Sequence, residues 1–496
     1  MCAPFKKEPE EKVLAPLCWP HLARDMVAEF LHTSPEALLA FEQEYTKASM
    51  NEATDDFFHI NSRQAAEQKH TVSVDDSNPT GYSTADLEAA MELQERVIAE
   101  LLAQTKVYSF DGHMSAYRRP LTLPDGFQPV QAEEVSKLPE ELRPDLTGNL
   151  LKRDIGKPAF GALLYFYDQF LHAPHPNDRE LAYNTFRQGL DILDLDPITY
   201  EIIGTNRNSM GHWFPQLVEA CQDQNFFRVP ATTIAKVPLT LLQLTRLPYE
   251  SLHNVTLTIV DRWAHAAFRL EDSKEYFVKT GTYSSKFDFR NARVTGAKEV
   301  RELGEYLLYI HYQALCMAHF TVKPRPIYGA STTNEWVVRE YIPDKEQNPC
   351  IYHGLPLHTE YRVFVDCDTD RVLGIAPYWE PQTMKKRFGQ EGDSDSIHQI
   401  HDYIVYKAHE ETLMRRFQEN QEAVASHIQE LLPRLDLSGQ WSIDVMQNGG
   451  DFWVIDMALA EQSFFYDRYV PKELRRPSKE NWLPEFPGVK TGEKES

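Results

Sequence analysis

The sequence predicts an α+β protein in which a mainly helical N-terminal region precedes a domain that mixes strands and helices. Before about residue 212, apolar side chains recur at helical spacing. Beyond that point the chain forms short β-type runs separated by Gly, Asn, Asp and Pro, with two long helical patterns among them. This mixture favours a mostly antiparallel sheet. We therefore expect three parts: a helical region of unassigned role over 1–211, a mixed domain over 212–470, and a polar tail over 471–496.

The first strong helix signal covers residues 83–102. Ser83 is a candidate N-cap with Asp86 three positions on, and an apolar stripe follows, formed by Leu87, Met91, Val97, Ile98 and Leu101. A second helical group covers 160–171 and 178–193. These stripes predict core-facing helices and indicate no particular chemistry.

In the mixed domain, seven runs have the composition of strands. They cover residues 255–264, 275–280, 335–342, 359–366, 372–379, 439–447 and 451–457. Two helical patterns cover residues 296–320 and 394–432. We expect the strands to form the sheet and the two long helices to cover it.

Composition limits the classes of function. Of the 496 residues, 42% are hydrophobic and 25% are charged, as in an ordinary globular protein, and no segment approaches the roughly 20 apolar residues of a membrane span. The acidic N-terminal stretch does not resemble a secretory signal, so we expect a cytoplasmic protein. The formal net charge of -23 opposes general nucleic-acid binding. An anionic ligand would therefore need a local cluster of positive side chains.

Familiar catalytic motifs are missing from the sequence. It contains no G-x-x-x-x-G-K-[ST], G-x-G-x-x-G, H-E-x-x-H or G-x-S-x-G. These absences argue against P-loop enzymes, dinucleotide-binding dehydrogenases, zinc proteases and ordinary serine hydrolases.

A lysine at the end of a predicted strand begins the candidate site. Lys279 is followed by Gly281, by the hydroxyls of Ser284 and Ser285, and by Lys286. Glycine lets the backbone approach a phosphate closely, hydroxyls hydrogen-bond its oxygens, and lysines supply charge. The alternative for any single lysine is a solvated surface residue.

The run 335–342 ends in a turn at Pro343 and has the shape of a hinge between two lobes. There, Glu340, Tyr341 and Ile342 could surround an adenine, although many core strands look similar. In the run 359–366, alternation places Arg362 on one face with Glu360 and Phe364. A buried arginine needs an acidic partner, so both a phosphate contact and a structural ion pair remain open for Arg362.

The hairpin 441–457 brings two carboxylates together. If residues 448–450 form a three-residue loop, Asp444 and Asp456 share one face at about 7–8 Å. Mg²⁺ with nucleotide phosphates would offset their repulsion, since it takes one or two carboxylates and completes its shell with phosphate and water. A two-residue turn would send the two aspartates to opposite faces.

Lysine loop, hinge, arginine strand and paired carboxylates follow one another in the order of a two-lobed ATP site. Protein kinases share the first two elements, but the chain has no H-R-D-x-x-x-x-N loop before Asp456. The ATP-grasp arrangement fits this order better.

Residues 212–467 resemble the cell division cycle protein 123 family, an ATP-grasp group. The resemblance rests on HWFPQL, VPATTIAKVPLTLL, FVKTGTYSSKFD, PLHTEYRVFV, VLGIAPYW, SIDV and FWVIDMAL, in that order. It implies that Lys279 and Arg362 contact ATP phosphates and that Asp444 and Asp456 hold Mg²⁺. It also implies a protein partner, which in that family belongs to eukaryotic translation initiation factor 2.

The sequence departs from the family after Asp456. The family's Asp-Phe-Asn-Pro is replaced here by Asp456-Met457-Ala458-Leu459, and alanine cannot coordinate a metal. Glu461, Gln462 or water could replace the missing ligand, or magnesium binding could be weaker.

Three functions follow from these expectations. The first is an ATP-dependent assembly or partner-binding factor. The second is an ATP-dependent ligase that forms an acyl phosphate and transfers the acyl group to an amine or thiol of a small-molecule acceptor. The third is a degenerate ATP-grasp scaffold without nucleotide turnover. No catalytic residue is assigned.

Overall fold

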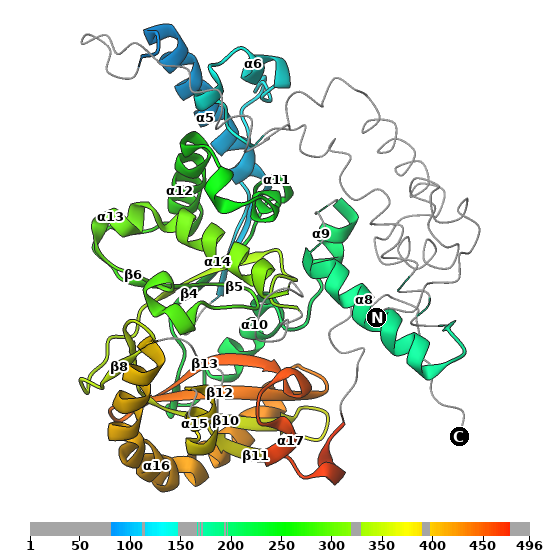
Figure 1. Ribbon diagram of the computed structural model, residues 1–496, viewed down its shortest axis with the longest axis vertical. Helices are drawn as coiled ribbons and strands as arrows, with labels where there is room; N and C mark the ends of the chain where they lie inside the picture. The colour runs from blue at the N-terminus through cyan, green and yellow to red at the C-terminus, as the bar shows by residue number, and fades with distance from the viewer. Residues whose placement is uncertain are drawn as a thin grey trace.

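In the computed structural model, two β-sheets stack along the long axis of the molecule and define two lobes (Figure 1). The structure describes residues 81–476 except 112–114, 147–165, 167–168, 170–171, 193–194, 196, 319–328 and 389–396. The mixed α+β class predicted from the sequence is confirmed.

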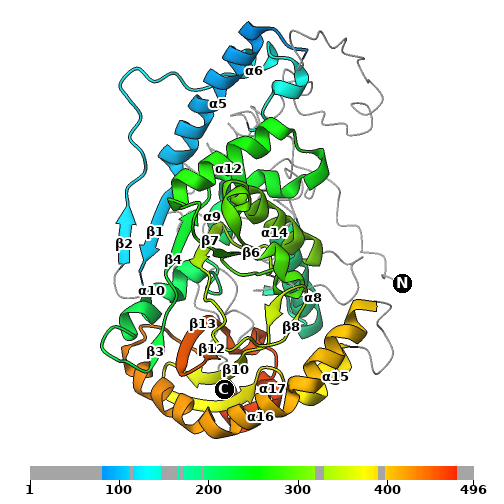
Figure 2. The ribbon, with the colours of Figure 1, turned by 90° about the vertical axis from the view of Figure 1, so that its left-hand side faces the viewer.

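The first lobe is built on a six-stranded antiparallel sheet. Its strand order is β2 (Ser115–Arg118), β1 (Lys106–Phe110), β4 (Thr232–Lys236), β7 (Glu335–Glu340), β5 (Tyr276–Thr280) and β6 (Arg293–Val294). Figure 2 shows β2, β1 and β4 side by side at one edge. Strands distant in sequence thus meet in one sheet, which places Lys279 of β5 beside Val337 of β7.

Helices cover both faces of this sheet. On one face, Trp263 of α12 (Asn254–Phe268) packs edge-on against Trp336 at 5.6 Å between ring centroids, and α14 (Leu303–Ala318) packs against β5. On the other face, Phe214 of α10 (Met210–Ala220) packs against Phe110. Further helices of this lobe and its surroundings are α5 (Thr84–Gln104), α6 (Ala132–Ser136), α8 (Pro176–Ile192), α9 (Pro197–Ile203), α11 (Leu239–Leu242) and α13 (Gly296–Arg301).

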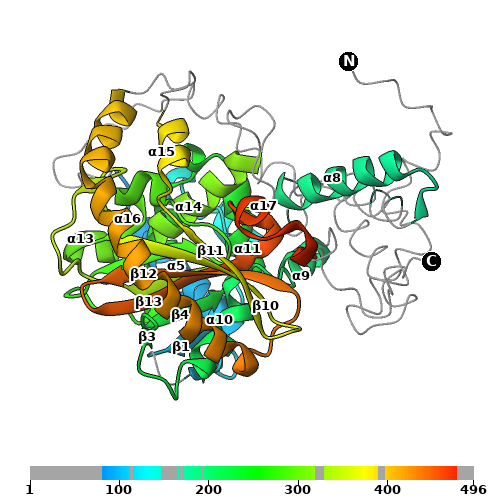
Figure 3. The same cartoon turned by 90° about the horizontal axis from the view of Figure 1, so that it is seen from below.

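The second lobe contains a five-stranded sheet. Its order is β11 (Arg371–Pro377), β10 (Thr359–Asp366), β12 (Gln440–Asn448), β13 (Asp451–Leu459) and β3 (Phe227–Arg228), with only β3 parallel to its neighbour among these described strands. The long helix α16 (Ile397–Leu431) packs against β10 and β11 on the outside (Figure 3). The remaining elements are α15 (Pro381–Arg387), α17 (Tyr466–Tyr469) and the small hairpin of β8 (Cys350–Ile351) and β9 (Leu355–Pro356).

Most predicted elements are confirmed, and one is wrong. Residues 255–264, expected as a strand, lie in α12. The buried positions of this helix recur at intervals of three and four residues, and they are Val255, Thr256, Ile259, Val260, Asp261, Trp263, Ala264, Ala267 and Phe268. The β-branched composition of this run misled the assignment, because burial against the sheet outweighs local propensity.

The helix α5 begins at the predicted N-cap, but the side chains that it buries differ in part from the predicted apolar stripe. The Ser83 hydroxyl accepts a hydrogen bond from the Asp86 backbone at 3.1 Å, which confirms the N-cap. Met91, expected in the apolar stripe, is 65% exposed, and Leu93 is buried instead. Of the second helical group, 178–193 corresponds to α8, whereas 160–171 lies largely outside the described residues.

The expected boundary between residues 211 and 212 falls inside α10. Strands β1 and β2, which precede this boundary, belong to the six-stranded sheet. Among the described residues, the upstream segment is therefore not purely helical and completes the first lobe.

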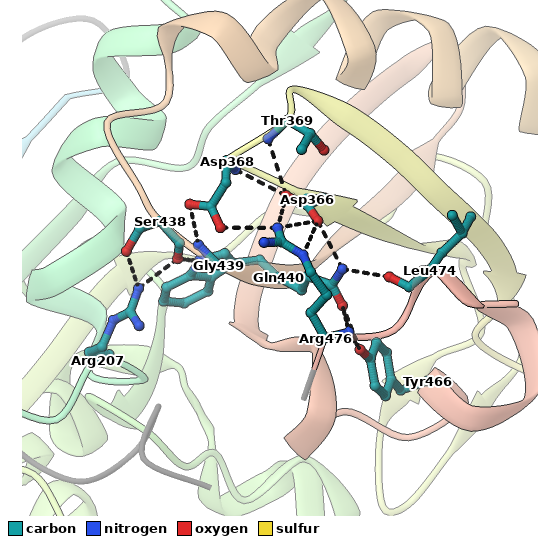
Figure 4. A network of polar contacts seen from close by, with 11 residues as sticks. Arg207, Asp366, Asp368, Thr369, Ser438, Gly439, Gln440, Tyr466, Leu474 and Arg476 are labelled. Carbon is teal, nitrogen blue, oxygen red and sulfur yellow. Dashed lines mark hydrogen bonds and ion pairs between the residues drawn. The ribbon is translucent and has the colours of Figure 1, made fainter. Parts of the chain in front are cut away.

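The beginning of the predicted tail is packed against the second lobe (Figure 4). Arg476 forms ion pairs with Asp366 and Asp368, and its backbone donates a hydrogen bond of 2.9 Å to Gln440 Oε1. Tyr466 also donates to Gln440 Oε1. Residues 471–476 are thus held by charge and hydrogen bonds, while 477–496 lie outside the described residues.

The three-residue turn predicted for the β12–β13 hairpin is wrong, but Asp444 and Asp456 do share one face of the sheet, as predicted. Asn448 pairs with Asp451, so the loop has only the two residues Gly449 and Gly450. A register shift between Asp444 and Val445 leaves Ile455 as an extra residue on β13. This β-bulge shifts the in–out alternation of β13 by one residue. Asp456 therefore lies on the same face as Asp444 and directly opposite it.

Candidate functional site

A cleft between the two lobes gathers most of the predicted site residues. Its walls come from β5 and β7 of the first lobe and from β10, β12 and β13 of the second. Of the ten predicted residues, eight line it: Lys279, Ser284, Lys286, Glu340, Tyr341, Ile342, Asp444 and Asp456. Apolar side chains from both lobes complete the lining, among them Phe277, Phe289, Leu355, Met446 and Ile455. The cleft thus combines an apolar part with a charged end.

Lys279 lies at the charged end and joins the two lobes. It is 3% exposed, and its Nζ lies 3.0 Å from Asp456 Oδ1. Burial lowers the pKa of this lysine, while Asp456 opposes the shift. The alternative of a solvated surface lysine is excluded by this burial.

The loop after Lys279 differs from the predicted phosphate loop. A Cβ on Gly281 would lie within 3 Å of Ser209 Oγ, Thr333 Oγ1 and Glu335 Oε2. The Gly281 backbone is also fixed, since its N–H donates to Glu335 O and its carbonyl accepts from Met210 N. Glycine is required here for close packing against the start of α10, and not for approach to a ligand.

The remaining loop residues are divided between the cleft and the interior. Ser284 lines the cleft, whereas Ser285 is buried and does not. Lys286 donates a hydrogen bond to the Tyr378 hydroxyl, and its Nζ lies 4.2 Å from the centroid of the Tyr378 ring. Burial lowers the pKa of Lys286, with Glu360 opposing the shift. A second lysine therefore reaches the charged end from the first lobe.

Arg362 forms a two-pronged ion pair with Asp444. Its Nε and Nη2 lie 2.8 and 2.6 Å from the two carboxylate oxygens, and both side chains are largely buried. Its guanidinium also lies over the Tyr378 ring at 4.8 Å. The structural ion pair considered for Arg362 is therefore present, and its partner is Asp444.

Each of the two aspartates has a cation as its partner. For Asp456, burial raises the pKa, but Lys279 and Arg339 lower it more, and the net effect is below the usual value. The Asp456 side chain retains 44% exposure and so faces the open cleft. The two aspartates are thus cross-strand neighbours, and each forms an ion pair, Asp444 with Arg362 and Asp456 with Lys279.

The donor set suits a magnesium ion that is shared with phosphate. Among the described residues, no group of three or more His, Cys, Asp or Glu side chains converges as a metal site would require. Mg²⁺ needs only one or two carboxylates when phosphate and water complete its octahedron. Asp444 and Asp456 therefore fit a nucleotide-bound ion and do not by themselves form a complete metal site.

At the position of the missing asparagine, Ala458 pairs with Ser442 across the sheet. Gln462, a possible replacement ligand, accepts a hydrogen bond from Asn208 Nδ2. Asn208 also accepts a 2.8 Å bond from Leu459 N through its Oδ1. The Gln462 carboxamide is thus already used to join the start of α10 to the end of β13.

The hinge has one backbone N–H without a backbone acceptor among the described residues. Glu340 N donates to Ala231 O at 2.9 Å and Tyr341 N donates to Glu275 O at 3.0 Å. Within the described part of the chain, Ile342 N has no such bond. Of the three described hinge amides, those of Glu340 and Tyr341 are thus used within the backbone.

Two further charged residues of the cleft were not predicted from the sequence. Arg339 is 5% exposed and stacks on Phe214, and its Nη1 donates to the carbonyl of the bulge residue Ile455. Its Nε and Nη2 have no hydrogen-bond partner among the described residues. Burial lowers the pKa of Arg339 to about 10. The alternation of the run 335–342 places Arg339 on the face opposite Trp336, a signal that could have identified it.

Glu360 is the second missed residue. It lines the cleft next to His358, and burial raises the pKa of its carboxyl to about 7. The positive charges of Lys286 and Arg362 lower this pKa, and the negative charge of Asp444 raises it. The pKa of Glu360 therefore depends on several charged groups of the cleft and its surroundings.

No helix in the described part of the chain combines the length and apolar character needed to cross a membrane. Searches found no matching family model and no match among curated proteins.

Solved structures do show similarity. C-terminally truncated Cdc123 from Schizosaccharomyces pombe matches 54% of this chain and 92% of its own, at 14% identity and a TM-score of 0.31. Cdc123 from the same organism matches 51% and 84%, at 14% identity and a TM-score of 0.29. The chain is thus structurally similar to Cdc123 over about half its length, at low sequence identity.

Proposed function

We propose that this protein binds ATP together with Mg²⁺ in the cleft between its lobes and acts as an ATP-dependent partner-binding factor. The observation that carries the proposal is a cleft lined by Lys279, Lys286 and Arg339, in which Arg339 Nε and Nη2 have no hydrogen-bond partner among the described residues. In a chain of net charge -23, three cations lining one cleft, with Arg362 beside them on Asp444, suit an anionic ligand.

The cleft offers a matching environment for each part of ATP. Phosphates would lie near the four cations, where buried donors form strong charge-assisted hydrogen bonds. The base would lie against Phe277, Phe289 and Tyr341, with Ile342 N as a donor to the ring edge. When bound, Mg²⁺ would be held by Asp444 and Asp456 and would neutralise phosphate charge. The Lys279 and Arg362 ion pairs orient these carboxylates.

The presence of alanine at residue 458 is consistent with ATP binding without rapid hydrolysis. Ala458, two positions after Asp456, supplies no ligand where a further metal contact would strengthen phosphoryl transfer. An ATP-dependent ligase would need such electrostatic stabilisation of the transferred group. We therefore favour a nucleotide-loaded state that stabilises the arrangement of the two lobes for a protein partner.

The first test is calorimetric titration with ATP in the presence and absence of Mg²⁺. Lys279→Ala should weaken binding by about 1.5–3 kcal/mol, because a buried charge-assisted contact is removed. Asp456→Asn should weaken binding mainly when Mg²⁺ is present. The control is Lys298→Ala, which changes a lysine that is 87% exposed. Unchanged ATP affinity in Lys279→Ala would contradict the proposed site.

A second measurement separates binding from catalysis. Purified protein with ATP and Mg²⁺ is expected to release phosphate slowly or not at all over the period in which it stays loaded. Stoichiometric release of ADP and phosphate on addition of an amine, thiol or carboxylate acceptor would instead establish a ligase. Absence of ATP binding under both metal conditions would leave the degenerate scaffold.

A further inference from the structure

One set of contacts between the two lobes lies at the start of α10, away from the interlobe cleft. Arg207 donates a hydrogen bond of 2.6 Å to Ser438 O (Figure 4), and Asn208 Oδ1 accepts a bond of 2.8 Å from Leu459 N. None of these four residues lines the cleft. An occupant of the cleft would therefore leave these bonds in place.

A second set of contacts between the lobes lies inside the cleft. Each of the three first-lobe cations that line the cleft donates to an acceptor of the second lobe. The pairs are Lys279 with the Asp456 carboxylate, at 3.0 Å, Lys286 with the Tyr378 hydroxyl, and Arg339 with the Ile455 carbonyl. We call these three pairs the interlobe clasp. The clasp joins the lobes through the same cations that an anionic ligand would contact.

An anionic ligand would compete with the acceptors of the clasp. Lys279 is 3% exposed, whereas the Asp456 side chain is 44% exposed and faces the open cleft. A phosphate oxygen that reached Lys279 would therefore lie close to the Asp456 carboxylate, and like charges at such a short separation repel each other. Lys286 likewise already donates to the Tyr378 hydroxyl. The ligand-free protein thus occupies both lysines of the cleft with its own acceptors.

We propose that the interlobe clasp is an autoinhibitory contact, in which second-lobe acceptors hold the cleft cations until a phosphate-bearing ligand displaces them. Direct bonds between the lobes are then replaced by bonds through the ligand, while the contacts at the start of α10 remain. A divalent cation on Asp456 would offset the repulsion of phosphate, so the clasp favours metal-bound over metal-free nucleotide. This inference rests on the proposed function for the identity of the natural ligand.

The test uses the full chain with inorganic tripolyphosphate as the probe, titrated calorimetrically in EDTA at constant ionic strength. Neither a nucleoside nor a metal ion then contributes to binding. Removal of a cation should weaken binding, so Lys279→Met and Lys286→Met should each raise the Kd by about tenfold or more. Removal of an acceptor should have the opposite effect, so Asp456→Asn and Tyr378→Phe should each lower the Kd several-fold.

The controls separate competition from changes in net charge and from misfolding. Tyr378→Phe changes no charge, so its tighter binding would come from the release of Lys286. In a Lys279→Met background, Asp456→Asn should give a smaller gain, because no lysine remains to be released. Asp456→Asn should also melt at a lower temperature, since a buried lysine loses its carboxylate, and a misfolded protein would not bind more tightly.

A matched ion pair outside the cleft provides the remaining control. Lys298→Met and Glu302→Gln alter a pair whose lysine is 87% exposed, and both should leave the tripolyphosphate Kd unchanged.

Different results would overturn the clasp and the proposed function. Unchanged or weaker tripolyphosphate binding in both Asp456→Asn and Tyr378→Phe would overturn the clasp. An undiminished gain from Asp456→Asn in the Lys279→Met background, or no binding by any variant, would also overturn it. If the variants follow the expected order but ATP with Mg²⁺ binds no more tightly than tripolyphosphate, the clasp stands and the proposed nucleotide site fails.

Discussion

At the scale of single residues, the charged end of the interlobe cleft combines satisfied and unsatisfied groups. Asp444 and Asp456 have close cationic partners in Arg362 and Lys279. Arg339 lies beside them with two buried N–H groups that no described residue accepts. A buried guanidinium with free donors costs stability unless a ligand pairs with it. Arg339 is thus the residue whose mutation best separates binding from folding.

Arg339→Met should leave the free energy of unfolding unchanged or raise it, because an incompletely paired buried charge is replaced by an apolar side chain. The same change should weaken ATP binding by about 1.5–3 kcal/mol. Urea denaturation and calorimetric titration measure the two quantities. Arg301→Met, which removes an exposed ion pair with Asp272, is the control and should affect neither strongly. Lower stability with unchanged ATP affinity would assign Arg339 a purely structural role.

Ala458→Asn tests whether a missing ligand limits magnesium binding. If the lack of a metal ligand at residue 458 is all that weakens magnesium binding, Ala458→Asn should bind ATP more tightly than the wild type in Mg²⁺. Without Mg²⁺ the two proteins should bind ATP equally well. The size-matched control is Ala458→Leu, which fills the same space without a metal ligand. The Mg²⁺ dependence of the ATP Kd decides the question. Equal behaviour of the two variants would mean that water or another group already fills this coordination position.

At the scale of elements, the loop after β5 is held by α10 and β7. Gly281 packs against Ser209, Thr333 and Glu335, and its backbone bonds to Met210 and to Glu335. Lys279 precedes this junction by two residues, so the position of its side chain depends on how α10 is seated. In the second lobe, the β12–β13 hairpin also positions a residue of the cleft, because its bulge at Ile455 brings Asp456 opposite Asp444.

Gly281→Ala should lower the free energy of unfolding by about 1–3 kcal/mol, since the new methyl group overlaps three polar atoms in a packed site. It should also weaken ATP binding by shifting Lys279. The control is Gly450→Ala in the hairpin turn, where a Cβ would meet no atom within 4 Å. Thermal melting and ATP titration of both variants provide the measurement. A Gly281→Ala protein with wild-type stability would contradict the close packing of this loop.

At the scale of the whole molecule, two buried acids make stability depend on pH near neutrality. Burial raises the pKa of Glu360 to about 7 and that of Asp261 to about 8. In both cases the folded state keeps a proton that the unfolded chain has lost. Stability from these groups is therefore greatest below their ordinary carboxyl pKa and falls as pH rises through the range from about 4 to 8. The ionised Asp456 and Asp366, whose pKa values are lowered, act in the opposite sense at lower pH.

Glu360→Gln should reduce this loss of stability. At about pH 8 the variant should be more stable than the wild type by about 3 kcal/mol, and near pH 4 the two should be similar. Urea denaturation across this pH range measures the difference. Glu88→Gln, on the exposed side of α5, is the control and should follow the wild-type curve. A constant difference at every pH would mean that the effect does not come from the Glu360 proton.

Much of the architecture could be predicted from local patterns. The strands 275–280, 335–342 and 359–366 were identified by composition and alternation, and the long helices by their apolar period. The charged residues of the cleft were found because they stand at the ends or on one face of these elements. The helix α12 escaped prediction because its β-branched residues resemble a strand, and the packing of its Trp263 against Trp336 is a tertiary effect.

The sequence by itself determined the mixed fold class, most strands and helices, and the set of lysines and carboxylates that could act together. Only the tertiary structure decided which of them meet. The pairing of Arg362 with Asp444, the two unsatisfied N–H groups of Arg339 and the packing role of Gly281 all depend on contacts between segments far apart in the chain. The hairpin shows the reason most clearly: a two-residue turn alone would separate Asp444 from Asp456, and a bulge that local sequence did not reveal restores their shared face.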